Sequence, residues 1–255
     1  MTAPTELYGL AAGLVIALVT APVGVSGAVF LLPVQLSVFG VPSPAVTPTN
    51  LLYNVVAGPG ALLRHRWEGT LGGPLVRLLV LGTLPGVVIG AAVRVFAVPG
   101  ATVFRLLVAG LLTPLGLWLV ARTLRPARTP PRPEPSPRAV TALALVVGIY
   151  GIGGGSLLGP VLVGRGMPVA VVAPAALAST FATSVVGAGA FALLSLTGSD
   201  VAPDWSLGLA CGIGGLIGGY LGARLQPRLP DRALRLLLGT LAMAVGGLYV
   251  VRGLV

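Results

Sequence analysis

Long apolar runs, separated by short polar or arginine-bearing turns, fill most of this chain. The first half has an interrupted apolar segment at 7–41 and then apolar spans near 45–63, 74–96 and 102–121. The second half has an interrupted segment at 139–164 and then spans near 168–197, 206–225 and 233–251. Several runs reach the roughly 20 residues that a helix needs to cross the hydrocarbon of a bilayer, so the pattern predicts an all-α integral membrane protein with about eight to ten membrane segments.

Residues 122–138, RTLRPARTPPRPEPSPR, interrupt this apolar pattern in the middle of the chain. A stretch so rich in proline and arginine is typical of a linker rather than of a helix or a core. The sequence therefore predicts a first membrane repeat at 1–121, a cytoplasmic linker at 122–138 and a second membrane repeat at 139–255.

The two halves resemble each other. Gly24 to Pro33 reads GVSGAVFLLP, and 127 residues later Gly151 to Pro160 reads GIGGGSLLGP. Further prolines, glycines and arginines recur at nearly the same offset, which indicates an internal duplication. A glycine-rich break at matching positions in two hydrophobic halves is typical of the binding site of a transporter.

The placement of arginine favours inverted over parallel repeats. If each interrupted segment crosses the membrane once, nine arginines lie on the linker side and seven on the other, which shows no bias. If each segment instead enters and returns on one side, as a hairpin of two short helices, thirteen lie on the linker side and three, Arg94, Arg105 and Arg252, on the other. The second arrangement fits the excess of cytoplasmic arginine and lysine in membrane proteins, so we expect each repeat to be a broken-helix hairpin followed by three transmembrane helices.

Composition supports the membrane assignment and narrows the function. Hydrophobic residues make up 55% of the chain and charged residues 9%, and the mean hydropathy is +0.99. The net charge of +10 comes from arginines scattered through short loops, which topology explains better than nucleic-acid binding does. The single cysteine, Cys211, excludes a disulfide or a cysteine metal cluster within one chain.

The two glycine-rich breaks supply the first candidate site residues. Uncovered backbone N–H groups at the start of a helix attract anions. The alternative is a tight helical break that packs closely and binds nothing. The candidates for substrate binding are Gly24, Ser26 and Gly27 in the first repeat and Gly153, Gly154, Gly155 and Ser156 in the second.

Neutral polar residues crowd the next helix of each half. Side chains four residues apart, such as Asn50 and Asn54, share one helix face and could complete an oxyanion site without a fixed positive charge. The alternative is that these side chains cap helices or bond to their own backbone, which is common in membrane spans. The candidates are Thr49, Asn50 and Asn54, then Ser179, Thr180 and Thr183, with Gln35 as a lone addition.

Ionisable groups and enzyme motifs are missing from the spans. All six acidic residues lie at span ends or in loops, and the only histidine, His65, has no second ligand at a spacing suited to a metal. A Walker-type loop, a nucleophile elbow and paired carboxylates are likewise absent from the sequence. We therefore expect neither an enzyme nor an ATP-driven pump, with no metal and no cofactor.

The two repeats resemble a known family. GVSGAVFLLPVQLSVFGVPSPAVTPTNLLYNV and GIGGGSLLGPVLVGRGMPVAVVAPAALASTFATSVVG are similar to the repeats of the TauE/SafE family of sulfite and organosulfur exporters. These carry a glycine-rich break, a proline, and then a segment of the Ala-Val/Gly-Thr-Ser/Asn-Leu type. The resemblance implies a multi-pass permease of the bacterial inner membrane for small sulfur-containing anions.

These observations lead to one main hypothesis and two alternatives. The main hypothesis is the export of sulfite, a sulfonate or a related anion, bound at the midplane between the two glycine-rich breaks. An importer or channel for a related anion is one alternative, and a non-transporting membrane scaffold is the other. The expected partners are the small anion, the lipid bilayer and, as a candidate assembly, a second copy in a homodimer.

Overall fold

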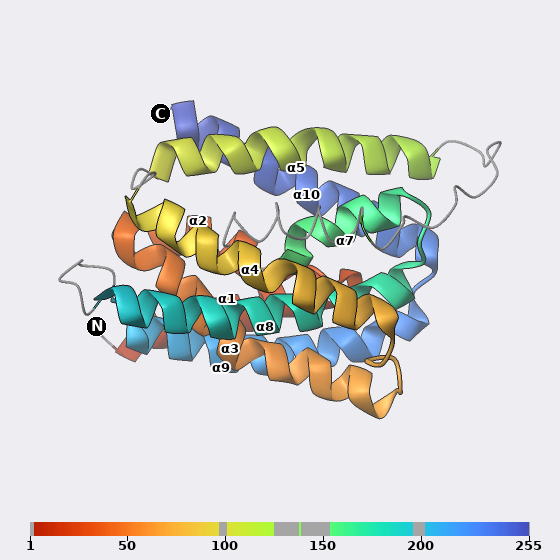
Figure 1. Cartoon of the computed structure of the whole chain (residues 1–255), viewed down its shortest axis with the longest axis horizontal. Coiled ribbons are helices and arrows are strands. Elements are labelled where there is room, and N and C mark those ends of the chain that lie inside the picture. Colours follow the sequence, from red (N-terminus) through yellow and green to blue (C-terminus); the bar gives the residue numbers. More distant parts are fainter. Residues whose placement is uncertain (1–2, 97–100, 125–137, 139–153, 196–201, 255) are drawn as a thin grey trace.

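Helices make up every regular element in the part of the chain that the computed structural model describes, which is residues 3–96, 101–124, 138, 154–195 and 202–254 (Figure 1). The prediction of an all-α protein is confirmed. The first half contains α1 (Ala3–Thr20), the short 3-10 helix η1 (Ala21–Val23), α2 (Ala28–Ser37), α3 (Ser43–Trp67), α4 (Pro74–Phe96) and α5 (Ala101–Leu124). The second half contains α7 (Gly154–Gly164), α8 (Val169–Ser195), α9 (Trp205–Leu225), η2 (Gln226–Arg228) and α10 (Asp231–Leu254).

The helix boundaries follow from local chemistry. α3 begins directly after Pro42, whose extended backbone cannot continue a preceding helix. α9 begins after Asp204, whose carboxylate accepts a hydrogen bond from the Leu207 N–H at 3.1 Å and so caps the helix. Six expected spans match α3, α4, α5, α8, α9 and α10 to within four residues at each end. The segment 139–153, and with it the first part of the second interrupted segment, lies outside the described residues.

Four of the described helical segments are long and apolar enough to cross a bilayer: Thr5–Val23, Val169–Leu193, Trp205–Arg228 and Asp231–Val251. Their outward faces carry large apolar side chains. Ile213 and Ile217 on α9, for example, are nearly half exposed, and so are Val88 and Ile89 on α4, whose apolar stretch, Pro74–Ile89, is shorter. Exposed apolar side chains repeated along neighbouring helices are what a lipid-facing surface requires.

The first interrupted segment is a hairpin, although its arms differ in length. α1 contains 18 residues, so it is about 27 Å long. α2 contains 10 residues, about 15 Å. We expected two short arms, but the apolar run before Pro22 is unbroken and α1 continues through all of it.

Close contacts between helices define their directions in the first half. Along α9, Leu207 faces Gly9 and Gly222 faces the carbonyl oxygen of Leu18, so α1 and α9 run in the same direction. Residues 52 and 61 of α3 face Gly208 and Gly219 in the same order, so α3 is parallel to α9 as well. Because α1 and α3 point the same way, the chain must return between them through α2. The segment therefore enters and leaves at one end of the bundle.

Contacts between the halves define the other directions. α8 is antiparallel to α3, because Gly187 faces Leu51 while Phe181 faces Gly58. α10 is antiparallel to α5, because Gly246 faces Thr113 while Gly239 faces residue 120. Opposite directions for equivalent helices are what inverted repeats require. The duplication itself stays a prediction.

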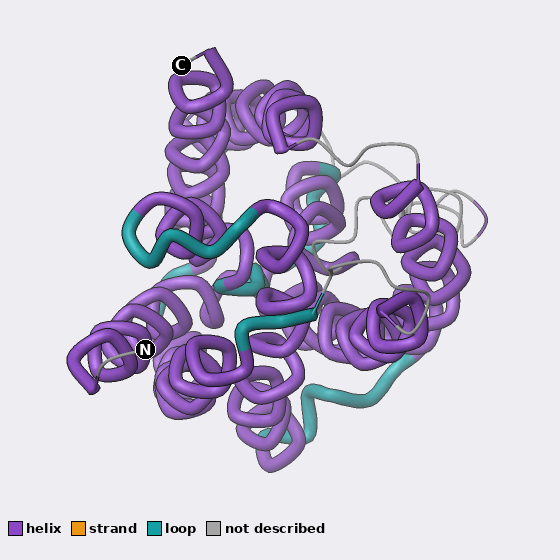
Figure 2. Tube along the Cα trace, turned by 90° about the vertical axis from the view of Figure 1, so that its left-hand side faces the viewer, coloured by secondary structure: helices purple, strands orange, loops and turns teal. Residues whose placement is uncertain are grey.

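Two ends of the bundle follow from these directions. The linker end holds the last residues of α3, α5, α7 and α9, and Figures 1 and 2 show both chain termini at the opposite end. Nine described arginines lie at or near the linker end: Arg64, Arg66, Arg77, Arg122, Arg165, Arg224, Arg228, Arg232 and Arg235. Arg94, Arg105 and Arg252 belong to helix segments near the opposite end. These are the three that the hairpin arrangement puts on the far side of the membrane.

A polar clamp ties α10 to the turn between α7 and α8 at the linker end. Asp231 accepts a hydrogen bond from the Val169 N–H at 3.0 Å. Arg235 forms an ion pair with Asp231 and donates to the carbonyl oxygens of Val163 and Met167 at 3.0 and 3.2 Å. Val163 lies at the C-terminal end of α7, where a cation also complements the helix dipole, and Met167 lies in the turn that follows.

Candidate functional site

The break between α1 and α2 is formed by Gly24 and its neighbours. Gly24 has φ +74°, in the left-handed region that favours glycine, and its N–H bonds to the Ala21 carbonyl. A Cβ at Gly24 would lie 2.4 Å from the Cα of Ala173 in α8, so only glycine fits this close approach. α2 then begins at Ala28 with Gly27 as its N-cap.

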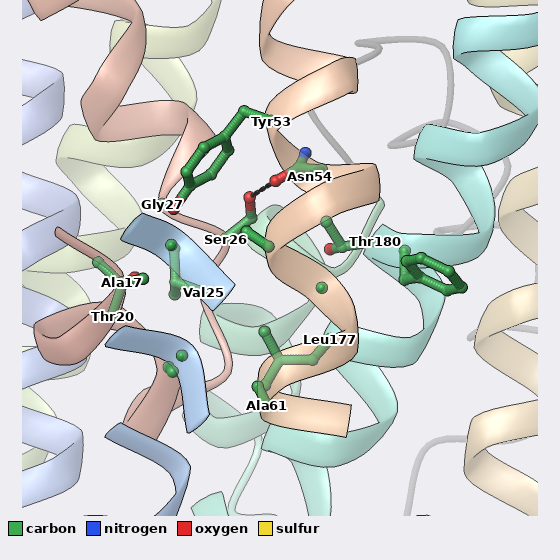
Figure 3. Close-up of a pocket in the computed structure, with 16 residues that line it drawn as sticks. Ala17, Thr20, Val25, Ser26, Gly27, Tyr53, Asn54, Ala61, Leu177 and Thr180 are labelled. Atoms are coloured by element: carbon green, nitrogen blue, oxygen red, sulfur yellow. Dashed lines mark hydrogen bonds between the residues drawn. The ribbon is translucent and has the colours of Figure 1, made fainter. Parts of the chain in front are cut away.

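Ser26 connects the break to the middle of α3. Its hydroxyl donates to the side-chain oxygen of Asn54 and accepts from the Ala28 N–H at 3.1 Å (Figure 3). Both side chains are buried. Asn54 lies one residue from the centre of α3, which spans residues 43–67. The first break therefore meets α3 about halfway along its length.

A small cavity of about 30 Å³ opens beside this contact. It is enclosed by α1, the break, α3, α8 and α9, and most of its lining is apolar, including Val25, Ala57 and Leu177 (Figure 3). We call it the break cavity. Its polar lining side chains are Thr20, Ser26, Tyr53, Asn54 and Thr180.

Three polar groups in this lining have no hydrogen-bond partner among the described residues. These are the hydroxyl oxygens of Thr20 and Thr180 and the side-chain nitrogen of Asn54. The three side chains are 2–4% exposed. A buried polar group without a partner costs about 1–3 kcal/mol, so three around one cavity indicate a place where a polar guest completes the bonding.

The start of α7, in the second half, approaches the same place. A Cβ at Gly155 would lie 1.8 Å from the carbonyl oxygen of Ala176 and 2.7 Å from the Thr180 hydroxyl. Gly154 is the first residue of α7, and Ser156 follows in its first turn. Gly153 lies outside the described residues, and so does the side chain of Ser156. The structure thus brings Ser26, Gly27, Asn54, Gly155 and Thr180 together.

Three other candidates are engaged elsewhere. Ser179 shares a hydrogen bond of 2.9 Å with Thr83 of α4, and so joins α8 to α4. Thr183 donates to backbone carbonyls of its own helix. Thr49 donates to the Ala45 carbonyl at 2.6 Å and accepts from the Asp204 N–H at 2.9 Å. These three residues therefore follow the alternative interpretation, in which neutral polar side chains in membrane helices bond to the backbone or to a neighbouring helix.

Asn50 and Gln35 are buried but do not line the break cavity. Asn50 lies one helical turn before Asn54, and its side-chain oxygen has no partner among the described residues. Gln35, in α2, is fully buried and lacks partners for both its amide nitrogen and its amide oxygen there. Whether either residue contacts a ligand stays a prediction.

Two lining residues were missed by the sequence interpretation. Thr20 is the last residue of α1. A threonine at this position, two residues before Pro22, looks like an ordinary helix-end residue and so did not indicate a binding site. Tyr53 precedes Asn54, and its hydroxyl would lie 2.3 Å from a Cβ at Gly27, so the two are in close contact. The position of Thr20 next to a glycine-proline break was the one available signal.

We expect Gly155→Ala to destabilise the protein and disturb the site. The added Cβ would overlap a backbone carbonyl, which cannot turn aside, so α7 must shift from α8 at a cost of about 1–3 kcal/mol. Thermal unfolding in detergent measures this cost. Gly189→Ala in α8 is the matched control, because a Cβ there meets no atom within 4 Å. Equal melting temperatures for the two variants would contradict the close contact of α7 with α8.

The arrangement is a largely apolar cavity with neutral hydrogen-bond donors beside a helix N-terminus. The first N–H groups of a helix lack partners within it and carry its positive dipole end. Hydroxyl and amide donors converging there suit a small acceptor-rich molecule, and an anion above all.

Comparison with known proteins gives one match. A family model described as "Sulfite exporter TauE/SafE" matches residues 9–249 of the 255. No curated protein and no solved structure matches the chain.

Proposed function

The chain belongs to the sulfite exporter TauE/SafE family, and on this premise we propose that it exports a small sulfur-containing anion across the bacterial inner membrane. The family is one of membrane permeases, and the apolar helices make the chain a multi-pass membrane protein. The candidate substrates are sulfite, a sulfonate or a related organosulfur anion. The break cavity is the binding site in this proposal.

The observation that carries the proposal is the set of unpartnered polar groups around the break cavity. Asn54 offers amide N–H donors, and Thr20 and Thr180 offer hydroxyls, all within one buried space. Sulfite and sulfonate oxygens are acceptors that can take these donors. Each hydrogen bond to a charged group contributes about 1.5–3 kcal/mol, so three suffice to offset a good part of the desolvation of one small anion.

The position of the cavity suits transport. Asn54 and Thr180 lie within two residues of the centres of α3 and α8, which span residues 43–67 and 169–195. An anion beside these two residues would lie about midway along the two helices, and Thr20 lies nearer the linker end. The excess of arginine at the linker end supports a cytoplasmic position for that end, so export in this proposal requires that the site opens first to the linker end and then to the other end.

The membrane potential supplies a driving force for export. An inside-negative potential contributes about 2.3 kcal/mol per charge per 100 mV toward moving an anion outward. We therefore expect the full chain in liposomes to move sulfite down the imposed potential, to an outside-to-inside ratio of about fifty at 100 mV when one negative charge crosses with each ion. Sulfite in each compartment is measured against protein-free liposomes.

The outcomes of the flux measurement separate the candidate functions. Flux that follows the imposed potential, and reverses when the potential is reversed, supports a reversible permease. In the cell, the inside-negative potential makes export the physiological direction of such a permease. Flux that ignores the potential contradicts uncoupled export. The absence of flux, together with no thermal stabilisation by sulfite, thiosulfate, taurine or sulfoacetate, favours the scaffold alternative, because a ligand that binds only the folded state must raise its stability.

A further inference from the structure

The break cavity carries no charged side chain among the described residues that line it. The described lining side chains are all apolar or neutral. Moreover, α2 and α8 contain no charged residue along their whole lengths. Among the described residues, a guest in this cavity meets hydroxyls, amide groups and peptide N–H groups, and no counter-ion.

The nearest cations along the surrounding helices lie just beyond the linker-end part of the cavity lining. Arg64 follows Asn54 by ten residues in α3, about 15 Å, and follows Ala61 of the lining by three, about 4.5 Å. Arg224 follows Gly215 by nine residues in α9, about 13 Å, and follows Gly219 of the lining by five, about 7.5 Å. Both arginines lie near the linker end, where water and salt screen charges over about 10 Å. Neither is among the described lining residues, so neither is paired with a charge held beside Asn54.

The number of negative charges on the guest therefore decides whether it can enter. The cost of moving an ion out of water grows with the square of its charge, whereas neutral donors gain only in proportion to it. We propose that the break cavity selects sulfur oxyanions with a single negative charge, hydrogen sulfite or an alkanesulfonate, and rejects dianions such as sulfite proper and sulfate. This rests on the proposed function, because it assumes that the anion binds in the break cavity.

The proposal predicts how affinity depends on pH. Hydrogen sulfite loses its remaining proton near neutral pH, so the monoanion becomes a smaller fraction of total sulfite as pH rises. When only that fraction binds, the apparent Kd increases about tenfold per pH unit well above the pKa of the ligand. Methanesulfonate keeps its single charge over the whole range, so its Kd should stay constant.

The comparison of sulfite with methanesulfonate also separates titration of the protein from titration of the ligand. Tyr53 is the ionisable side chain among the described lining residues, and a phenol ordinarily ionises near pH 10. Other ionisable side chains on the helices around the cavity lie toward helix ends or outside its lining: Glu6, Tyr8, Arg64, His65, Arg66, Cys211, Tyr220 and Arg224. Any effect of these groups on the site would appear with methanesulfonate too.

The experiment uses the full chain purified in detergent under anaerobic conditions, which keep sulfite from oxidising to sulfate. Binding of sulfite, methanesulfonate and sulfate is measured by calorimetry from pH 6 to pH 9. We expect methanesulfonate to bind with a constant Kd, sulfite to weaken by about tenfold per pH unit at the alkaline end, and sulfate not to bind at concentrations that saturate with methanesulfonate.

Two results overturn the proposal, and they differ in what else they affect. If sulfate binds as tightly as methanesulfonate, or if the Kd of sulfite does not change with pH, charge selection is wrong while the proposed function stands. If none of the three anions binds at any pH, the proposed function fails and the charge selection fails with it.

Discussion

Replacing both Asn54 and Thr180, as Asn54→Leu with Thr180→Val, is expected to weaken anion binding by at least about a hundredfold. Each side chain offers a donor that has no partner among the described residues of the empty protein. A hydrogen bond to a charged group contributes about 1.5–3 kcal/mol, so losing both costs about 3–6 kcal/mol. Calorimetry with methanesulfonate measures the single variants and the double variant.

Stability serves as the internal check on this double variant. Thr180→Val removes a buried hydroxyl that makes no bond within the described structure, so the empty protein should melt near the parent temperature. Asn54→Leu also removes the bond from Ser26, and a modest loss is expected. Thr240→Val is the control for affinity, because Thr240 is exposed and bonds to its own helix. A folded double variant with the parent Kd would show that the anion binds elsewhere.

Gly218→Val is expected to have the largest effect on folding. In α9, a Cβ at Gly214, Gly218 or Gly222 would lie 1.9, 2.1 or 2.6 Å from a carbonyl oxygen of α1. Two helices that approach so closely must separate along their length to admit a side chain, and the packing that holds α1 is then lost. We expect a destabilisation of about 3 kcal/mol or more, seen as loss of the monodisperse folded fraction in detergent.

Gly247→Val in α10 is the matched control for this prediction. A Cβ at Gly247 meets no atom within 4 Å, so the same change of residue should leave the yield and the melting temperature near those of the parent. If Gly218→Val instead melts like the Gly247→Val protein, α1 does not pack tightly against α9.

Apolar run length and proline placement were sufficient to predict most of the helices. The runs after Pro42 and Pro168 begin helices because proline ends the preceding segment, and α3 and α8 follow directly. The length of α1 was underestimated, because α1 begins at Ala3, four residues before the apolar segment at 7–41. The glycines at 214, 218 and 222, spaced four residues apart, pack closely against α1, as such a row in a membrane helix allows.

The candidate site could be predicted only in part. Asn54 and Thr180 stand out because polar side chains in apolar runs are costly unless they have a partner or a purpose. Ser179 looked equivalent to its neighbour Thr180, but its partner is Thr83, which lies 96 residues earlier in the chain. Tertiary packing decides which of two adjacent polar residues faces a cavity and which one bonds to another helix. The local sequence pattern does not contain this information.

The polar clamp at the linker end limits how the protein can move. Asp231 and Arg235 hold the end of α7 and the start of α8 through three hydrogen bonds to backbone atoms, and α10 is packed along α5. A rearrangement that opens the cavity toward this end would have to break these bonds or carry α10 along with α7. Moving α10 together with α7 keeps the bonds intact. The moving body would then include α10 and the α7–α8 turn, and it would move relative to a static pair formed by α1 and α9.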